Sequence, residues 1–136
     1  MSAAFYIVLD REDPGFDTMV NGKFLSQDDR RLERVANSLG LRPLGEYVSY
    51  SPEEAREIME DMGTDPDEIE GMELPEQKWY DPQEGLDWVR KVSMYLQANP
   101  SAVKNSKGVL ADLEEYRIVL EQAEAVGARW NLKVDF

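Results

Sequence analysis

The sequence predicts an α+β fold, with a small, mostly antiparallel sheet of three to four strands packed by about four helices. Two β-prone segments lie at the ends of the chain, residues 4–10 and 129–136, and the stretches between them carry apolar residues at helical spacing. Proline and glycine signals separate these stretches. We therefore expect the first and last strands to be adjacent, in a single α+β domain over residues 1–136.

The strand expected over residues 4–10 (AFYIVLD) is apolar on both faces, which favours a central strand covered on both sides. It ends at the Asp-Pro-Gly turn signal of residues 13–15. The dipeptide Asn21-Gly22 is typical of a hairpin, but its flanking segments are short, so a small hairpin and a plain loop both remain open.

Two further strands are expected. Residues 44–50 (LGEYVSY) form the next β-prone segment along the chain. Residues 129–136 alternate apolar and polar side chains, which predicts one buried face and one solvated face. The apolar positions of this last strand are Trp130, Leu132, Val134 and Phe136.

Two helices are expected in the first half of the chain. Ser26 is a suitable N-cap for the first helix, and Gly40 ends it in the left-handed conformation. The second helix begins at Ser51, with a proline and two acidic residues in its first turn, and Gly63 stops it. Residues 63–80 are then expected to form an acidic loop.

Two longer helices follow. Residues 81–84 (DPQE) have the form of a capping box with a proline inside it, and the helix that they begin ends at Asn99. Ser106 is expected to cap the last helix, and Gly127 to close it. The apolar seam of this helix, which suits packing against a partner helix, consists of Val109, Leu113, Tyr116, Leu120 and Ala123.

The chain contains no cysteine and no histidine. These absences exclude disulfides, thiolate nucleophiles and triads built on histidine, and they remove the commonest ligands of zinc, copper and iron. No dinucleotide fingerprint or phosphate loop is present either. We therefore expect no cofactor and no enzyme activity, with a carboxylate-based hydrolase as an alternative because 28 acidic residues are available.

The net charge of −13 is concentrated in one segment. Residues 51–88 carry fourteen acidic side chains against Arg56 and Lys78, whereas the segments on either side are nearly neutral. No segment supplies the basic footprint that a phosphate backbone requires, so nucleic-acid binding is not expected. There is no run of about 18 apolar residues and no secretory signal, so we expect a cytoplasmic protein that does not span a membrane.

Two groups of residues are candidates for binding a partner. The acidic group, Asp65, Asp67, Glu68 and Glu70, superficially resembles a calcium loop, but an apolar residue stands at the fifth position and the glycine arrives one residue late. A solvated acidic loop is the ordinary interpretation of this group. The functional interpretation is a surface that steers a basic protein partner.

The aromatic candidates are Trp79 and Tyr80, which precede the helix that begins near Asp81. Aromatic side chains with polar tips are enriched at interfaces and in ligand pockets. The structural alternative is a hydrophobic staple that packs against the first turns of the helix.

Three segments of the chain carry a family resemblance: FDTMVNGK near the start, YDPQEGLDWVRKVSMYLQANP, and VLADLEEYRIVLEQAEAVGARWNLKVDF at the end. Together they resemble a family of small uncharacterised bacterial proteins, cyanobacterial ones included, that has no assigned activity. The family pattern reads Trp-His-Leu near the end, where this chain has Trp130-Asn131-Leu132, so a histidine-dependent role is in doubt here. The resemblance implies a bacterial, cytoplasmic protein and assigns no catalytic or binding residue.

The sequence thus predicts a non-catalytic protein-interaction or accessory domain. It is expected to self-associate through an aromatic and aliphatic patch or to bind a basic protein. The alternative interpretation is an acidic inhibitor of a basic partner, either an immunity protein or a nucleic-acid mimic.

Overall fold

A computed structural model describes residues 4–11, 14–18, 20, 22–74 and 76–135. The sequence signals that involve Asp13, Asn21, Pro75 and Phe136 fall in part outside these ranges. The chain divides into two units, each of which is described by itself. The core unit comprises Met1–Val48 and Trp79–Phe136, and the acidic unit comprises Ser49–Lys78.

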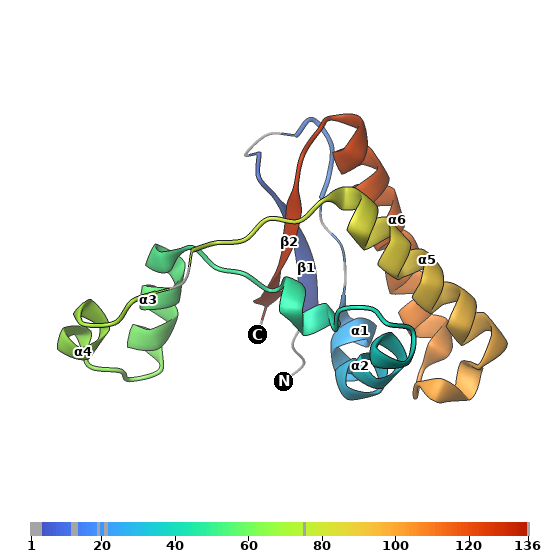
Figure 1. Cartoon of the computed structure of the whole chain (residues 1–136), viewed down its shortest axis with the longest axis horizontal. Coiled ribbons are helices and arrows are strands. Elements are labelled where there is room, and N and C mark those ends of the chain that lie inside the picture. The colour runs from blue at the N-terminus through green and yellow to red at the C-terminus, as the bar shows by residue number, and fades with distance from the viewer. Residues whose placement is uncertain (1–3, 12–13, 19, 21, 75, 136) are drawn as a thin grey trace. The chain divides into compact units, whose positions relative to one another are not determined.

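The sheet of the core unit consists of two antiparallel strands, β1 (Ala4–Leu9) and β2 (Trp130–Asp135), which lie side by side in Figure 1. Their register places Ile7 opposite Leu132. Burial alternates along β1, where every second side chain from Phe5 onward is buried and the others are half-buried. β1 is therefore not the fully covered central strand that its apolar composition predicts.

The prediction of three to four strands is wrong, because residues 44–50 do not form a strand. Leu44–Tyr47 form a 3₁₀ helix, η1, and a single β-bridge between Val48 and Leu132 follows it. A strand would place the side chains of residues 44 and 47 on opposite faces. The 3₁₀ turn aligns side chains three residues apart, and both are consequently buried in the same core.

The described residues form six α-helices instead of about four. One additional helix, α1 (Lys23–Gln27), begins directly after Gly22, so the segment that follows the hairpin signal is helical. Ser26 lies inside α1 and is not an N-cap. Asp28 occupies the N-cap position of the next helix, α2 (Asp29–Ser38).

The two longest helices, α5 (Pro82–Ala98) and α6 (Ser106–Ala125), pack against each other (Figure 1) and are joined through the short 3₁₀ helix η2 (Pro100–Ala102). Asp81 caps α5, since its side chain accepts a hydrogen bond from the N–H of Gln83, the second helical residue, and not from Glu84 as in the predicted capping box. The cap of α6 is Asn105 and not Ser106. The predicted apolar seam of α6 is buried along its whole length, which confirms its assignment to the core.

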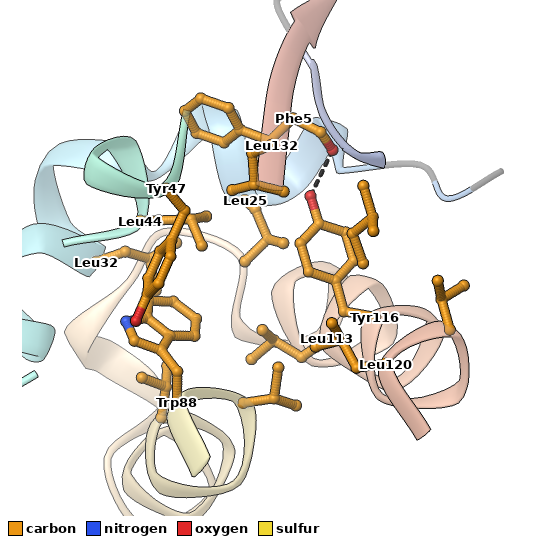
Figure 2. Close-up of a cluster of buried hydrophobic side chains, with 14 of the residues drawn as sticks. Phe5, Leu25, Leu32, Leu44, Tyr47, Trp88, Leu113, Tyr116, Leu120 and Leu132 are labelled. Carbon is orange, nitrogen blue, oxygen red and sulfur yellow. Dashed lines mark hydrogen bonds between the residues drawn. The ribbon is translucent and has the colours of Figure 1, made fainter. Parts of the chain in front are cut away.

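The helices cover the inner face of the sheet with one apolar core, shown in Figure 2. The hydroxyl of Tyr116, from α6, donates a hydrogen bond to the carbonyl of Phe5 on β1 and thereby ties the helix to the strand. Trp88, from α5, is also buried, and its indole N–H donates to the carbonyl of Arg42 at 2.8 Å. The polar tips of these two large aromatic side chains are thus satisfied inside the core.

Two buried carboxylates join segments that are far apart in the sequence. Asp112, in α6, accepts hydrogen bonds at one oxygen, Oδ2, from the main-chain N–H groups of Phe24 (2.9 Å) and Leu25 (3.2 Å). Asp28 accepts from the N–H groups of Lys104 (3.2 Å) and Asn105 (3.1 Å). Asp112 thus satisfies main-chain donors in the first turn of α1, and Asp28 satisfies those of the two residues that precede α6.

The acidic unit contains α3 (Pro52–Asp61) and α4 (Pro66–Glu70). Ser51 begins α3 with a complete capping box, because its side chain accepts from the N–H of Glu54 while that glutamate accepts from the N–H of Ser51. α4 lies inside the segment predicted to be a loop, and Asp65 caps it. No side chain of α3 is fully buried, so the apolar face of this amphipathic helix is only partly covered.

We expect the substitution Gly22→Ala to destabilise the core unit. A Cβ atom at this position would lie 1.9 Å from the carbonyl oxygen of Phe5 and 2.5 Å from the hydroxyl of Tyr116, so the backbone would have to shift. The free energy of unfolding should fall by about 1–3 kcal/mol, measured by urea denaturation. Gly45→Ala is the matched control, because nothing lies within 4 Å of a Cβ atom there, and a similar loss in both variants would contradict the prediction.

A second prediction concerns Asp112, whose pKa is raised chiefly by burial, with a further contribution from Glu115 and an opposing one from its two N–H partners. Because the pKa in the folded state exceeds that of the unfolded chain, the free energy of unfolding should fall as the pH rises through the raised pKa. Asp112→Asn removes this pH dependence and keeps an oxygen for both N–H groups, whereas Asp112→Ala leaves them unpaired and should cost about 2 kcal/mol.

Urea denaturation of these two variants between acidic and neutral pH separates the effects. Equal destabilisation by the asparagine and alanine substitutions at neutral pH would show that Asp112 does not anchor α1 through its oxygen.

Candidate binding surfaces

The structure places the predicted aromatic and acidic residues in different units. Trp79 and Tyr80 belong to the core unit, at the segment that leads into α5. The acidic candidates, which are Asp65, Asp67, Glu68 and Glu70, all lie in or beside α4 of the acidic unit. The two groups are therefore considered as separate surfaces.

Tyr80 is held in place by the core unit. Its main chain exchanges two hydrogen bonds with Trp130, at 2.8 and 3.0 Å, and its hydroxyl donates to the carbonyl of Glu46 at 3.0 Å. Its ring makes an edge contact with Tyr47, and the guanidinium of Arg42 lies 5.5 Å from its centroid. These contacts assign Tyr80 a structural role at the edge of β2.

Trp79, in contrast, lines a groove that runs along β1. The groove has a volume of about 490 Å³, which falls within the range of small-molecule sites. Tyr6 and Val8 contribute their half-buried side chains from the outer face of the strand. The rest of the described lining consists of Ile7, Leu9, Asp10, Arg11, Pro14 and Thr18.

Ile7 and Leu9 contribute to this groove mainly through their main chain, because their side chains are buried on the opposite face of the sheet. The N–H of Asp10 donates to the carbonyl of Arg129 at 3.0 Å, so the even-numbered residues of β1 are the ones that form hydrogen bonds with β2. Because main-chain direction alternates along a strand, the N–H and C=O groups of residues 5, 7 and 9 point away from β2.

This outward edge of β1 is closed at one end and open at the other. At Phe5, the hydroxyl of Tyr116 and the backbone near Gly22 occupy it. At Ile7 and Leu9, no described residue forms a hydrogen bond with the outward main-chain groups. The groove therefore exposes a short stretch of unpaired strand edge, which is the feature that binds extended peptides by strand addition.

The described lining of the groove offers binding groups and no catalytic pair. Asp10 is its one carboxylate, and that side chain already accepts a hydrogen bond from the N–H of Arg129 at 2.9 Å. A second hollow, beside α2, contains Asp28 and Asp29, but both oxygens of Asp28 are occupied by main-chain N–H groups. Neither hollow presents the two available carboxylates that hydrolysis requires.

The acidic candidates form a charged surface on a small helical unit. Asp65 is occupied as a cap, since its Oδ1 atom accepts from the N–H of Asp67 at 3.0 Å, while Asp67, Glu68 and Glu70 are exposed. The acidic unit as a whole carries eleven acidic side chains against two basic ones, a net charge of −9. Among the described residues, no group of three or more acidic side chains is arranged to hold a metal ion.

Sequence reasoning missed the groove residues Tyr6 and Val8. Their segment reads as a buried strand because it is apolar on both faces, but the sheet has only two strands and leaves this face half-buried. The signal that was available is the absence of a third convincing strand to cover the edge of β1.

In the part of the chain that the structure describes, no helix combines the length and apolar character needed to cross a membrane. The resemblance to small bacterial proteins stays a prediction, and the functional interpretation rests on the two surfaces described above. Comparisons of the chain with protein-family models, with curated proteins and with solved structures find no match.

Proposed function

We propose that this chain is a non-catalytic protein-interaction domain that binds an extended peptide segment along the open edge of β1. The observation that carries the proposal is the groove in which the outward main-chain groups of Ile7 and Leu9 have no described partner. The lack of cysteine is compatible with the reducing cytoplasm.

The chemistry of the groove favours a bound peptide that is extended and carries an apolar side chain. The main-chain groups of β1 offer hydrogen bonds that any sequence in extended conformation can satisfy. Selectivity then comes from the side chains that alternate into the groove, where Tyr6, Val8 and Trp79 form an apolar and aromatic surface. Asp10 and Arg11 at the end of the groove provide polar partners for the flanking residues of the peptide.

The partner segment comes from another protein and not from β1 of a second copy. The open edge of β1 lies in a groove beside Pro14 and Thr18, and a second β1 would bring the same flanking residues with it. A single extended peptide meets no such obstacle. In addition, two copies that each carry a net charge of −13 repel each other unless opposite charges meet locally.

A second candidate function, inhibition of a basic partner, is favoured by the composition of the acidic unit. Its eleven acidic residues lie mainly on α3 and α4, where helical geometry holds them in a fixed array. Capture of partners from the native host at low and high salt tests this function. A specific partner that is rich in arginine and lysine and is released at high salt would support it, whereas capture that is insensitive to salt would contradict it.

The groove is tested by amide hydrogen exchange combined with selection of binding peptides from a random display library. In the free protein, the outward amides of Ile7 and Leu9 should exchange at least about tenfold faster than the ladder amides of Tyr6 and Val8. Selected peptides should slow exchange at Ile7 and Leu9. Val8→Lys should weaken peptide binding about tenfold or more, because it places a charge in the apolar floor of the groove.

Ile118→Lys is the matched control, because it introduces the same charge at an apolar side chain of α6 that is 46% exposed and lies outside the groove. The proposal fails if the selected peptides protect neither outward amide, or if they bind the Val8 and Ile118 variants equally well.

A further inference from the structure

We propose that a hollow on α2 binds the end of α3 from a second copy of this chain. This hollow, here called the α2 hollow, has a volume of about 270 Å³. Val35, Tyr95 and Ala102 give it an apolar lining, and the exposed side chains of Arg31 and Arg34 add positive charge beside that lining. The site is separate from the groove along β1, with which it shares no lining residue.

The positive charge around the α2 hollow extends beyond it. A neighbouring hollow of about 510 Å³ shares Arg31 and Arg34, adds Arg30, and also contains Asp28 and Asp29. Arg31 pairs with Asp28 at 3.3 Å, but among the described residues neither Arg30 nor Arg34 forms an ion pair. Three arginines within five residues, two of them without a described carboxylate partner, form a surface that attracts an acidic group.

The end of α3 in the acidic unit has the complementary character. Glu60 and Asp61 are exposed in its last turn, and no basic residue lies there to balance them. The carbonyl groups at a helix C-terminus add partial negative charge to these carboxylates. Met62 follows directly and is 80% exposed, so an apolar side chain lies beside concentrated negative charge.

The α2 hollow and the end of α3 match in charge and in apolar character. The flexible thioether of Met62 suits the apolar part of this hollow, and its sulfur can pack favourably against the ring of Tyr95. The carboxylates of Glu60 and Asp61 would then lie near Arg31 and Arg34, where charge-assisted hydrogen bonds form. The contact would thus bury Met62, an apolar side chain that is exposed in the single chain.

The large net charge does not prevent this contact. At physiological ionic strength, exposed charges more than about 8 Å apart are largely screened, so local pairs outweigh the repulsion between whole molecules. The acidic unit carries −9 of the total charge of −13, and the contact places part of that charge against arginines. Association of this kind should therefore weaken as salt is added.

The test is sedimentation velocity of the full chain over a range of concentrations, at low salt and at about 0.15 M salt. The wild-type chain should self-associate, more weakly at the higher salt. Arg34→Glu and Asp61→Arg should each weaken self-association about tenfold or more. Arg129→Glu makes the same charge change at an exposed arginine outside the hollow and should leave self-association unchanged.

The decisive experiment mixes the two weakened variants. An equimolar mixture of Arg34→Glu and Asp61→Arg should associate more strongly than either variant alone. In the mixture, the acidic residue 34 of one variant can pair with the basic residue 61 of the other, and the unchanged Arg34 and Asp61 can pair as well. A wild-type chain that is strictly monomeric at low salt would overturn the proposal. Variants that self-associate like the wild type would also overturn it. So would a mixture that associates no more strongly than the two variants do separately.

Discussion

The pairing of β1 with β2 is the constraint on which the rest of the core unit depends. Two strands alone are marginally stable in water, so this ribbon needs a covered face. α1, α5 and α6 supply that cover on the inner side, and the bond from Tyr116 to Phe5 holds α6 against the strand. In the described residues no third strand or helix covers the other face and edge to the same extent, and the groove is the result.

An acidic chain uses some of its carboxylates inside the fold. Asp28 and Asp112 are both buried, and each accepts hydrogen bonds from main-chain N–H groups that lie 76 to 88 residues away in the sequence. Such bonds supply partners for main-chain donors in the first turn of α1 and directly before α6. Asp28 and Asp112 therefore act as internal acceptors, in contrast to exposed acidic side chains such as Asp67, Glu68 and Glu70 of the acidic unit.

The sequence predicted the long helices well because several local signals agree there. The Asp81 cap, the α6 seam and Gly127, at φ 69°, all lie where expected. Short elements were predicted poorly. The prediction of a strand at residues 44–50 was wrong because 3₁₀ and strand periodicities are not separable over so few residues. The helix α4 was missed, although Asp65-Pro66 has the same cap form as Asp81-Pro82. The groove could not be predicted, because it depends on which strand edge remains uncovered.

The β1–β2 ladder also has a consequence for how the chain is made. The 120 residues between Leu9 and Trp130 must leave the ribosome before the two strands can meet, which takes on the order of ten seconds at typical rates of synthesis. During that interval, the apolar segment of β1 has neither its ladder partner nor the complete helical cover of the finished fold. β1 is thus the element that waits longest for its partner strand, and a chaperone that recognises extended apolar chains would meet it first.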